Sequence, residues 1–229
     1  MVGTLSKPKS YCIPFENTNK GKRIYVAVKA EYNGRGLDRS YKPLPWASKQ
    51  FLPNMPGAFG GNEIDWPYVK GGYPVNYTTK NASTSCREET LVREMREESG
   101  GKLELTITNA LGVPDYAALD DKSNAMKFYA LPITTVKGTP GDNPYYPKSN
   151  STPTPHTWPD SKKYAYSENI KTCSIDVSSL VKGESDDGIA TLLFKGIGIR
   201  TVANADLLAW KDSGTGKAIL AIVKSKFGI

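Results

Sequence analysis

One segment of the sequence gathers acidic side chains at a spacing that suits metal chemistry. It is the stretch 86–99, CREETLVREMREES, in which five of the fourteen residues are glutamates. Glu94, Glu97 and Glu98 stand at positions i, i+3 and i+4, so they share one face of a helix. Carboxylates this close repel one another by roughly a few tenths of a kcal/mol per exposed pair, and a nearby positive charge is needed to offset this repulsion.

Two kinds of positive charge fit this face of the expected helix. Arg93 and Arg96 lie within the same turns and can form a surface lattice of ion pairs. A hard divalent cation is the other kind, since Mg²⁺ and Mn²⁺ prefer oxygen ligands. The spacing of the three acids by itself leaves both readings open.

The residues around these acids decide between the two readings. Residues 93–100 read R-E-M-R-E-E-S-G, which matches the pattern R-E-U-x-E-E-x-G, where U is a large apolar residue. In this segment the chain resembles the Nudix hydrolases, whose box is G-x5-E-x7-R-E-U-x-E-E-x-G-U on a loop-helix-loop. The flanking segments agree, because 66–72 (WPYVKGG) is similar to the apolar-Pro-Gly-Gly strand before the box and 103–108 resembles the strand after it.

The first half of the box departs from the family pattern. Arg93 follows Gly72 by twenty-one positions, about seven more than in the family. Ser85 stands where the box has its first glutamate, Thr79 where it has its first glycine, and Gly101 at its terminal apolar position. The resemblance therefore rests on the second half of the box.

The resemblance implies a fold, an activity and a cofactor. The fold is an α/β/α sandwich with a mixed β-sheet. The activity is metal-dependent hydrolysis of a diphosphate bond in a nucleoside diphosphate linked to another moiety. The resemblance also implies that Glu94, Glu97 and Glu98 bind Mg²⁺ or Mn²⁺ and that Arg93 orients these glutamates through ion pairs.

The chemistry of a diphosphate explains why such a site needs a metal. Its negative charge repels hydroxide, whereas a bound metal neutralises that charge and lowers the pKa of a coordinated water. Glu97 or Glu98 is the candidate base for the proton of that water. The resemblance also implies that the backbone carbonyl of Gly72 faces the metal, and Lys70 is a candidate phosphate-binding residue. Three acids outside the helix are candidates by composition alone: Glu184, Asp186 and Asp187.

Two other classes of function stay open at this point. The first is a Nudix-fold module whose altered box no longer catalyses and which binds a nucleotide or a protein partner. The second is a basic nucleic-acid-binding protein with an unrelated charged helix. Thirty lysines and arginines against 23 acids give a net charge of +7, which favours anionic partners such as a nucleotide diphosphate or the 5′ end of an RNA. The basic residues are scattered, without an arginine-rich tract.

The elements that position the acidic segment follow from periodicity. Residues 23–31 alternate between apolar and other side chains and predict a strand. Residues 1–22 are expected to form a polar arm or loop, 32–65 a long ordered loop, and 66–70 a short strand. The acidic segment 86–99 contains neither Gly nor Pro, and it predicts the clearest helix of the chain.

The second half of the chain predicts more strands and a last helix. Four segments are expected to be strands: 102–108, 126–136, 172–177 and 189–201. Residues 137–165, rich in proline and aromatic residues, predict an insertion that is a functional lid or a disordered segment. Apolar positions in 219–227 fit one face of a C-terminal helix. This order predicts a single domain, 1–229, with a mixed sheet and helices packed against it, rather than a doubly wound parallel sheet.

Composition limits the class of protein. The chain has 229 residues, of which 38% are hydrophobic, and no window approaches the roughly 20 consecutive apolar residues of a membrane-spanning helix. Residues 1–10 lack the apolar core of a secretory signal. The three cysteines are widely spaced and odd in number, which argues against a disulfide scaffold and favours a reducing, cytoplasmic location. No partner membrane is expected, and the oligomeric state stays open.

Overall fold

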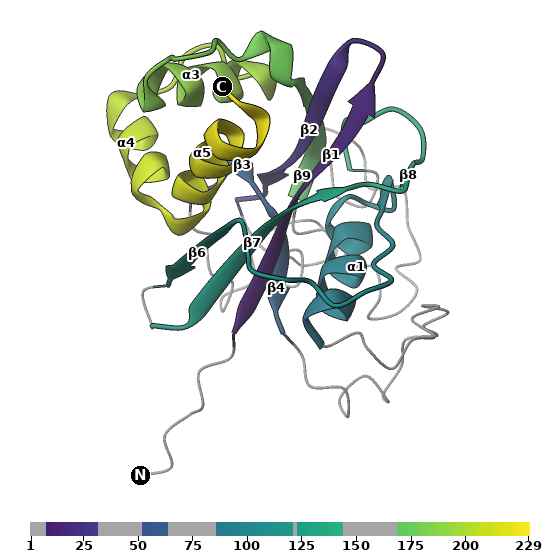
Figure 1. Cartoon of the computed structure of the whole chain (residues 1–229). Coiled ribbons are helices and arrows are strands. Elements are labelled where there is room, and N and C mark those ends of the chain that lie inside the picture. Colours follow the sequence, from purple (N-terminus) through teal and green to yellow (C-terminus); the bar gives the residue numbers. More distant parts are fainter. Residues whose placement is uncertain (1–7, 32–51, 64–85, 121–122, 144–168) are drawn as a thin grey trace, which may run out of the picture.

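A curled, mixed seven-stranded sheet forms the centre of the molecule (Figure 1). The computed structural model describes residues 8–31, 52–63, 86–120, 123–143 and 169–229. The strands of this sheet are β1 (Lys9–Thr18), β2 (Gly21–Lys29), β3 (Pro56–Gly57), β4 (Phe59–Asn62), β6 (Tyr116–Leu119), β7 (Ala125–Pro132) and β9 (Asn169–Asp176). Their order is β3-β2-β1-β7-β6, with β4 paired to β1 and β9 to β2. β1 and β7 are parallel, and the other pairs are antiparallel.

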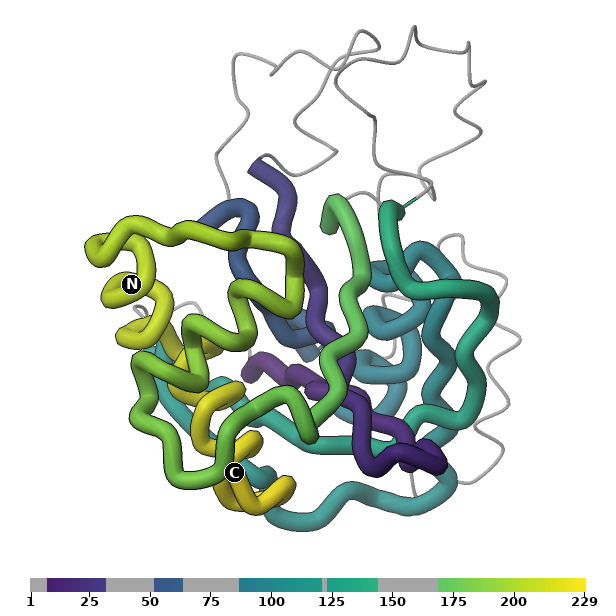
Figure 2. The backbone as a smooth tube through the Cα atoms, turned by 90° about the horizontal axis from the view of Figure 1, so that it is seen from above, coloured from purple at the N-terminus to yellow at the C-terminus, as the bar shows by residue number. Residues whose placement is uncertain are grey.

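Helices cover both faces of the sheet. On one side lies α1 (Cys86–Glu98), and on the other lie α3 (Asp186–Gly196), α4 (Asn204–Asp212) and α5 (Gly214–Phe227), as Figure 2 shows from above. Central strand β2 explains this arrangement, because Ile24, Val26 and Val28 join the core beneath the C-terminal helices, whereas Tyr25 and Ala27 join the core beneath α1. The prediction of a mixed sheet with helices packed against it is confirmed at this level.

Residues 1–22 do not form only an arm or loop, because β1 is a central strand. Cys12 and Ile13 are fully buried on its two faces. Pro14 makes this strand hard to predict from the sequence, because proline lacks the backbone N–H that a central strand donates to its neighbour. The structure accommodates it where the antiparallel partner of β1 changes from β4, at Lys9–Cys12, to β2, at Phe15–Thr18.

The expected long loop 32–65 contains two short strands within its described part. β3 pairs with β2 and β4 pairs with β1, so both belong to the central sheet. Glycine and proline supply much of 56–61, and these residues are depleted in strands, so the sequence signal is weak. The expected short strand 66–70 lies outside the described residues.

The predicted strand 189–201 is wrong, because most of it belongs to α3. Its apolar run suits a strand or a buried helix equally, and the residues before it decide the outcome. The Ser185 hydroxyl accepts a hydrogen bond from the amide of Gly188 at 3.1 Å and caps the helix. Asp186 and Asp187 then fill its first turn, where negative charge is favourable. Helix α4 and strand β6 were not anticipated.

Other predicted elements are confirmed. The segment 126–136 forms β7 and, after the break at Pro132, the short strand β8 (Thr135–Val136). β8 pairs with β5 (Leu103–Glu104), which is shorter than predicted, although the inward positions of 102–108 are buried as expected. The predicted strand 172–177 corresponds to β9, which ends in the 3-10 turn η3 (Val177–Ser179). The C-terminal helix is α5, and within the described ranges no helix has the length and apolar character to cross a bilayer.

Candidate functional site

Helix α1 places the glutamates at the edge of the apolar core. Leu91 and Met95 are four residues apart, and both are buried in the core on this face of the sheet. The helix packs against β4 and β1 through this stripe. Glu97 and Glu98 are buried as well, which is unusual for charged side chains and requires partners for them.

Arg93 connects two of the three glutamates. Its Nη2 lies 2.5 Å from Glu94 Oε1, and its Nη1 lies 2.8 Å from Glu97 Oε2. Burial alone would lower the pKa of Arg93, but the charges of Glu94 and Glu97 and their hydrogen bonds outweigh it and hold this pKa above its usual value. The guanidinium therefore stays charged and fixes the two carboxylates relative to each other.

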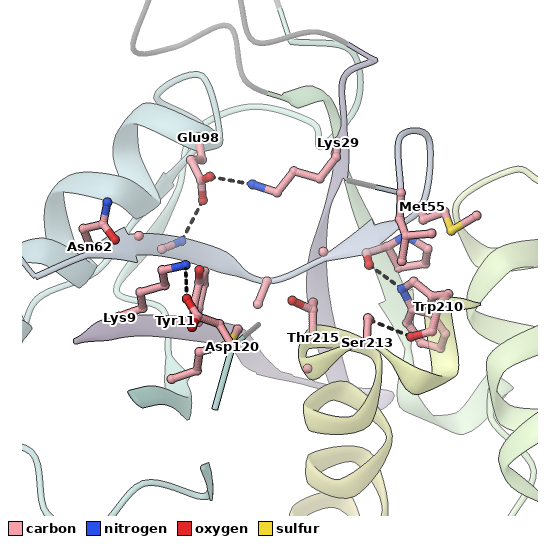
Figure 3. A pocket seen from close by; sticks show the side chains of 18 of the residues that line it. Lys9, Tyr11, Lys29, Met55, Asn62, Glu98, Asp120, Trp210, Ser213 and Thr215 are labelled. Atoms are coloured by element: carbon pink, nitrogen blue, oxygen red, sulfur yellow. Dashed lines mark hydrogen bonds and ion pairs between the residues drawn. The ribbon is translucent and has the colours of Figure 1, made fainter. Parts of the chain in front are cut away.

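Glu98 is held from the opposite side by β2 and β4. Its Oε1 accepts a hydrogen bond from Lys29 Nζ at 2.7 Å, and its Oε2 accepts one from the Gly60 amide at 2.7 Å (Figure 3). Its backbone carbonyl accepts a hydrogen bond from Asn169 Nδ2 at 3.1 Å. Charge-assisted hydrogen bonds of this kind compensate for the burial of Glu98, which is 1% exposed.

The glycine pair beside these acids is Gly60-Gly61, which sequence reasoning missed. A Cβ atom on Gly60 would lie 2.1 Å from the carbonyl oxygen of Ser10, and the φ of Gly60 is +146°, so glycine is required there. A Cβ on Gly61 would lie 3.1 Å from Glu94 Oε1. The sequence signal was a second apolar-Gly-Gly run, Phe59-Gly60-Gly61, upstream of the one selected.

Several predicted residues do not contribute to this arrangement. Gly72 and Lys70 lie outside the described residues. Asp186 and Asp187 belong to α3 on the other face of the sheet, where they form ion pairs with Lys224 and Lys211. Glu184 precedes the same helix. The acids proposed by composition alone therefore belong to the start of α3 and not to the site beside α1.

A cavity of about 810 Å³ opens next to Glu98. Glu98, Gly60 and Gly61 contribute to one part of its wall, and Ser213 and Thr215, between α4 and the start of α5, contribute to another (Figure 3). Its volume lies within the roughly 300–1,000 Å³ typical of small-molecule sites. The cavity is therefore large enough for a small molecule, and of the three glutamates Glu98 is the one in its wall.

Tyr11 lines the same cavity from β1. Desolvation is the main reason that its pKa is raised to about 12. The charge of Lys29 lowers this pKa, while those of Glu98, Glu94 and Asp120 raise it. The phenol is therefore a neutral hydrogen-bonding group at physiological pH and not a base.

Glu94, Glu97 and Glu98 carry the type of ligand atom that a hard divalent ion prefers, since carboxylate oxygens bind Mg²⁺ and Mn²⁺. Their arrangement in the structure is not that of a formed metal site. In the part of the chain that the structure describes, no three His, Cys, Asp or Glu side chains are gathered around one point. Instead, the glutamates are in ion pairs with Arg93 and Lys29, whereas Arg96 is exposed.

Comparisons with known proteins supply no family for this chain. Neither the models of protein families nor the curated proteins contain a match to it.

Proposed function

We propose that this protein is a metal-dependent hydrolase of the Nudix type, which cleaves a diphosphate bond in a nucleoside diphosphate linked to another moiety. One observation carries the proposal: Glu94, Glu97 and Glu98 occupy one side of α1, beside the Gly60-Gly61 backbone and next to a cavity of ligand size. A mixed sheet between helical layers is also the architecture that the resemblance implies.

The three glutamates are the groups that would hold Mg²⁺ or Mn²⁺. When bound, such an ion neutralises the diphosphate and lowers the pKa of a coordinated water. Arg93 keeps Glu94 and Glu97 in a fixed relation through one hydrogen bond to each. Glu97 or Glu98 accepts the proton of the attacking water, and their burial keeps other water from these carboxylates.

The test is hydrolysis of a panel of nucleotides in the presence of Mg²⁺ or Mn²⁺. The panel contains a nucleoside triphosphate, a nucleotide sugar, ADP-ribose, a dinucleotide and a 5′-triphosphorylated RNA. We expect release of phosphate or of a nucleoside monophosphate, and loss of this activity in Glu97→Gln and in Glu98→Gln. Glu104→Gln is the matched control, because Glu104 lies on β5 and its ion pair is with Lys137, whereas the glutamates of α1 pair with Arg93 and Lys29. Undiminished turnover in both test variants would contradict the catalytic assignment.

The second candidate is a module of the same fold that binds a nucleotide or a protein partner without cleaving it. The ion pairs favour it specifically, because Arg93 and Lys29 already balance the carboxylates that a metal would need. Saturable nucleotide binding with no turnover under any divalent metal would support this function over the hydrolase.

A further inference from the structure

The cavity beside Glu98 has a second wall that is fixed in place. The Trp210 indole, at the end of α4, donates a hydrogen bond of 2.8 Å to the carbonyl of Pro56 on β3. The Ser213 hydroxyl accepts a hydrogen bond from the Gly216 amide at 3.0 Å and so caps α5. A Cβ on Gly216 would lie 1.9 Å from the Trp210 carbonyl oxygen, so the corner between α4 and α5 requires glycine at this position. The wall opposite the glutamates is therefore preorganised.

The charges in this cavity do not favour a second highly anionic group. Among the residues that the structure describes, two lysines and three acids line it, which together carry a formal charge of −1: Lys9, Lys29, Glu98, Asp120 and Asp212. Both lysines are paired, since Lys9 lies 2.6 Å from Asp120 and Lys29 lies 2.7 Å from Glu98. A chain of phosphates would meet carboxylates here without a matching excess of cations.

The rest of the lining suits a ring with apolar faces. Met55 and Met126 contribute adaptable thioether side chains, and Trp210 and Pro56 contribute further apolar surface. Leu119 also lines the cavity, and its side chain is 66% exposed, so its apolar surface is accessible to a bound molecule. Asn62, Thr215 and Tyr11 add a few uncharged polar groups, the combination expected of a site that orients a ring.

We propose that this cavity binds an uncharged aromatic ring, a nucleobase or a heterocycle of similar size, and excludes phosphate-rich groups from all but its Glu98 end. The identity of this ring as part of a diphosphate substrate rests on the proposed function. The α4–α5 corner and Leu119 are then the elements that determine which ring binds, and the substrate is a small nucleotide rather than a polyphosphate or an RNA end.

The test measures binding without metal, so that it does not depend on turnover. Adenosine, uridine and inorganic tripolyphosphate are titrated into the full chain in EDTA by calorimetry, with ligand-observed NMR for weak binders. We expect at least one nucleoside to bind about tenfold or more tightly than tripolyphosphate. We also expect Leu119→Ala to weaken nucleoside binding about fivefold, because it removes apolar contact surface. The control is Leu208→Ala on α4, which is 57% exposed but does not line the cavity and should leave binding unchanged.

The outcomes separate this inference from the proposed function. Tighter binding of tripolyphosphate than of either nucleoside overturns it, as does an equal effect of the two leucine variants. Nucleoside binding that depends on Leu119 without hydrolysis of any nucleotide supports the cavity assignment and contradicts the hydrolase. If hydrolysis requires Glu97 but Leu119→Ala leaves nucleoside binding unchanged, the cavity assignment is overturned and the proposed hydrolase is not.

Discussion

The ammonium of Lys29 lies 2.7 Å from the carboxylate of Glu98, although the two residues are 69 positions apart in the chain. The register of β2 against β9 shifts between Val28 and Lys29. Irregularities of this kind change the direction of side chains and are common beside functional sites. The pair therefore joins the end of β2 to the end of α1. The Lys29 ammonium occupies the Glu98 carboxylate that the proposed metal would need.

Lys29→Met should strengthen Mn²⁺ binding about tenfold. In the wild-type protein an incoming ion must displace the ammonium from Glu98 and bind beside a like charge, whereas the variant removes this competitor. Titration of Mn²⁺, followed by the loss of its free-ion paramagnetic resonance signal, measures the affinity directly and requires no substrate.

Lys9→Met is the matched control for this prediction. It removes the same charge from the same cavity, but Lys9 pairs with Asp120 and not with Glu98. We expect less than about a threefold change in Mn²⁺ affinity, because the effect is only that of a more distant charge. An equal gain in both variants would show a general electrostatic effect and contradict the specific role of Lys29.

Arg93→Lys should impair the site more than it impairs the helix. A lysine cannot reproduce the two separate N–H contacts through which the guanidinium holds Glu94 and Glu97. We expect kcat/KM to fall about 100-fold and stability to fall by about 1–3 kcal/mol. Arg96→Lys on the exposed side of the same helix provides the comparison and should change neither quantity appreciably. Similar losses of kcat/KM and stability in the two variants would contradict the specific role of the Arg93 guanidinium.

The sequence predicted the parts of this site that depend on local periodicity. The glutamates and the buried stripe of α1 lie on one continuous helix, so a spacing of three and four residues determines their relation. The same reasoning found β2, because its apolar positions alternate without interruption. Spacing alone offered Arg93 and Arg96 equally as partners of the glutamates, and only the resemblance to the box pointed to Arg93, whose partners lie one and four residues away in the same helix.

The features that the sequence did not predict depend on pairing between distant segments of the chain. Glu98 meets Lys29 and Gly60 only because the sheet brings β2 and β4 to α1, and no local pattern records that pairing. Strand β1 carries a proline, and β4 is rich in glycine, so each contradicts strand propensity while its partners impose the extended conformation. The cavity likewise combines β4 with the α4–α5 corner, about 150 residues apart, and only the tertiary structure reveals it.

The protein should lose stability at alkaline pH through Tyr11. Its pKa is about 12 in the folded chain against 10.0 for an unperturbed tyrosine, with desolvation as the main cause. Below pH 10 the phenol keeps its proton in both the folded and the unfolded chain, so the stability contribution of its raised pKa is fully present. As the pH rises from 10 toward 12, the unfolded chain loses this proton more readily than the folded chain, and the contribution is lost. Denaturant unfolding measures the free energy of unfolding at pH 9 and at pH 11.5. The decrease between these two pH values should be smaller in Tyr11→Phe than in the wild type by about 1–2 kcal/mol. The same drop in both proteins would contradict the role of Tyr11.

Gly60→Ala should destabilise the fold by about 3 kcal/mol or more, since its methyl group would overlap the Ser10 carbonyl and its φ of +146° disfavours a side chain. Gly112→Ala is the control, because a Cβ at Gly112 meets no atom within 4 Å. Chemical denaturation of the two variants compares these effects, and equal stability would contradict the close approach of β4 to β1.

Gly61→Ala separates the role of β4 at the site from its role in folding. The new methyl group would lie 3.1 Å from Glu94 Oε1, the end of a flexible side chain that can move aside, so the fold should stay within about 1 kcal/mol of the wild type. The shift of Glu94 by a few tenths of an ångström should still weaken Mn²⁺ binding severalfold, because it changes the position of one carboxylate relative to Glu97 and Glu98. Unfolding experiments and the Mn²⁺ titration on one preparation measure both effects. Unchanged metal affinity in a folded Gly61→Ala protein would contradict a contribution of Glu94 to the proposed metal site.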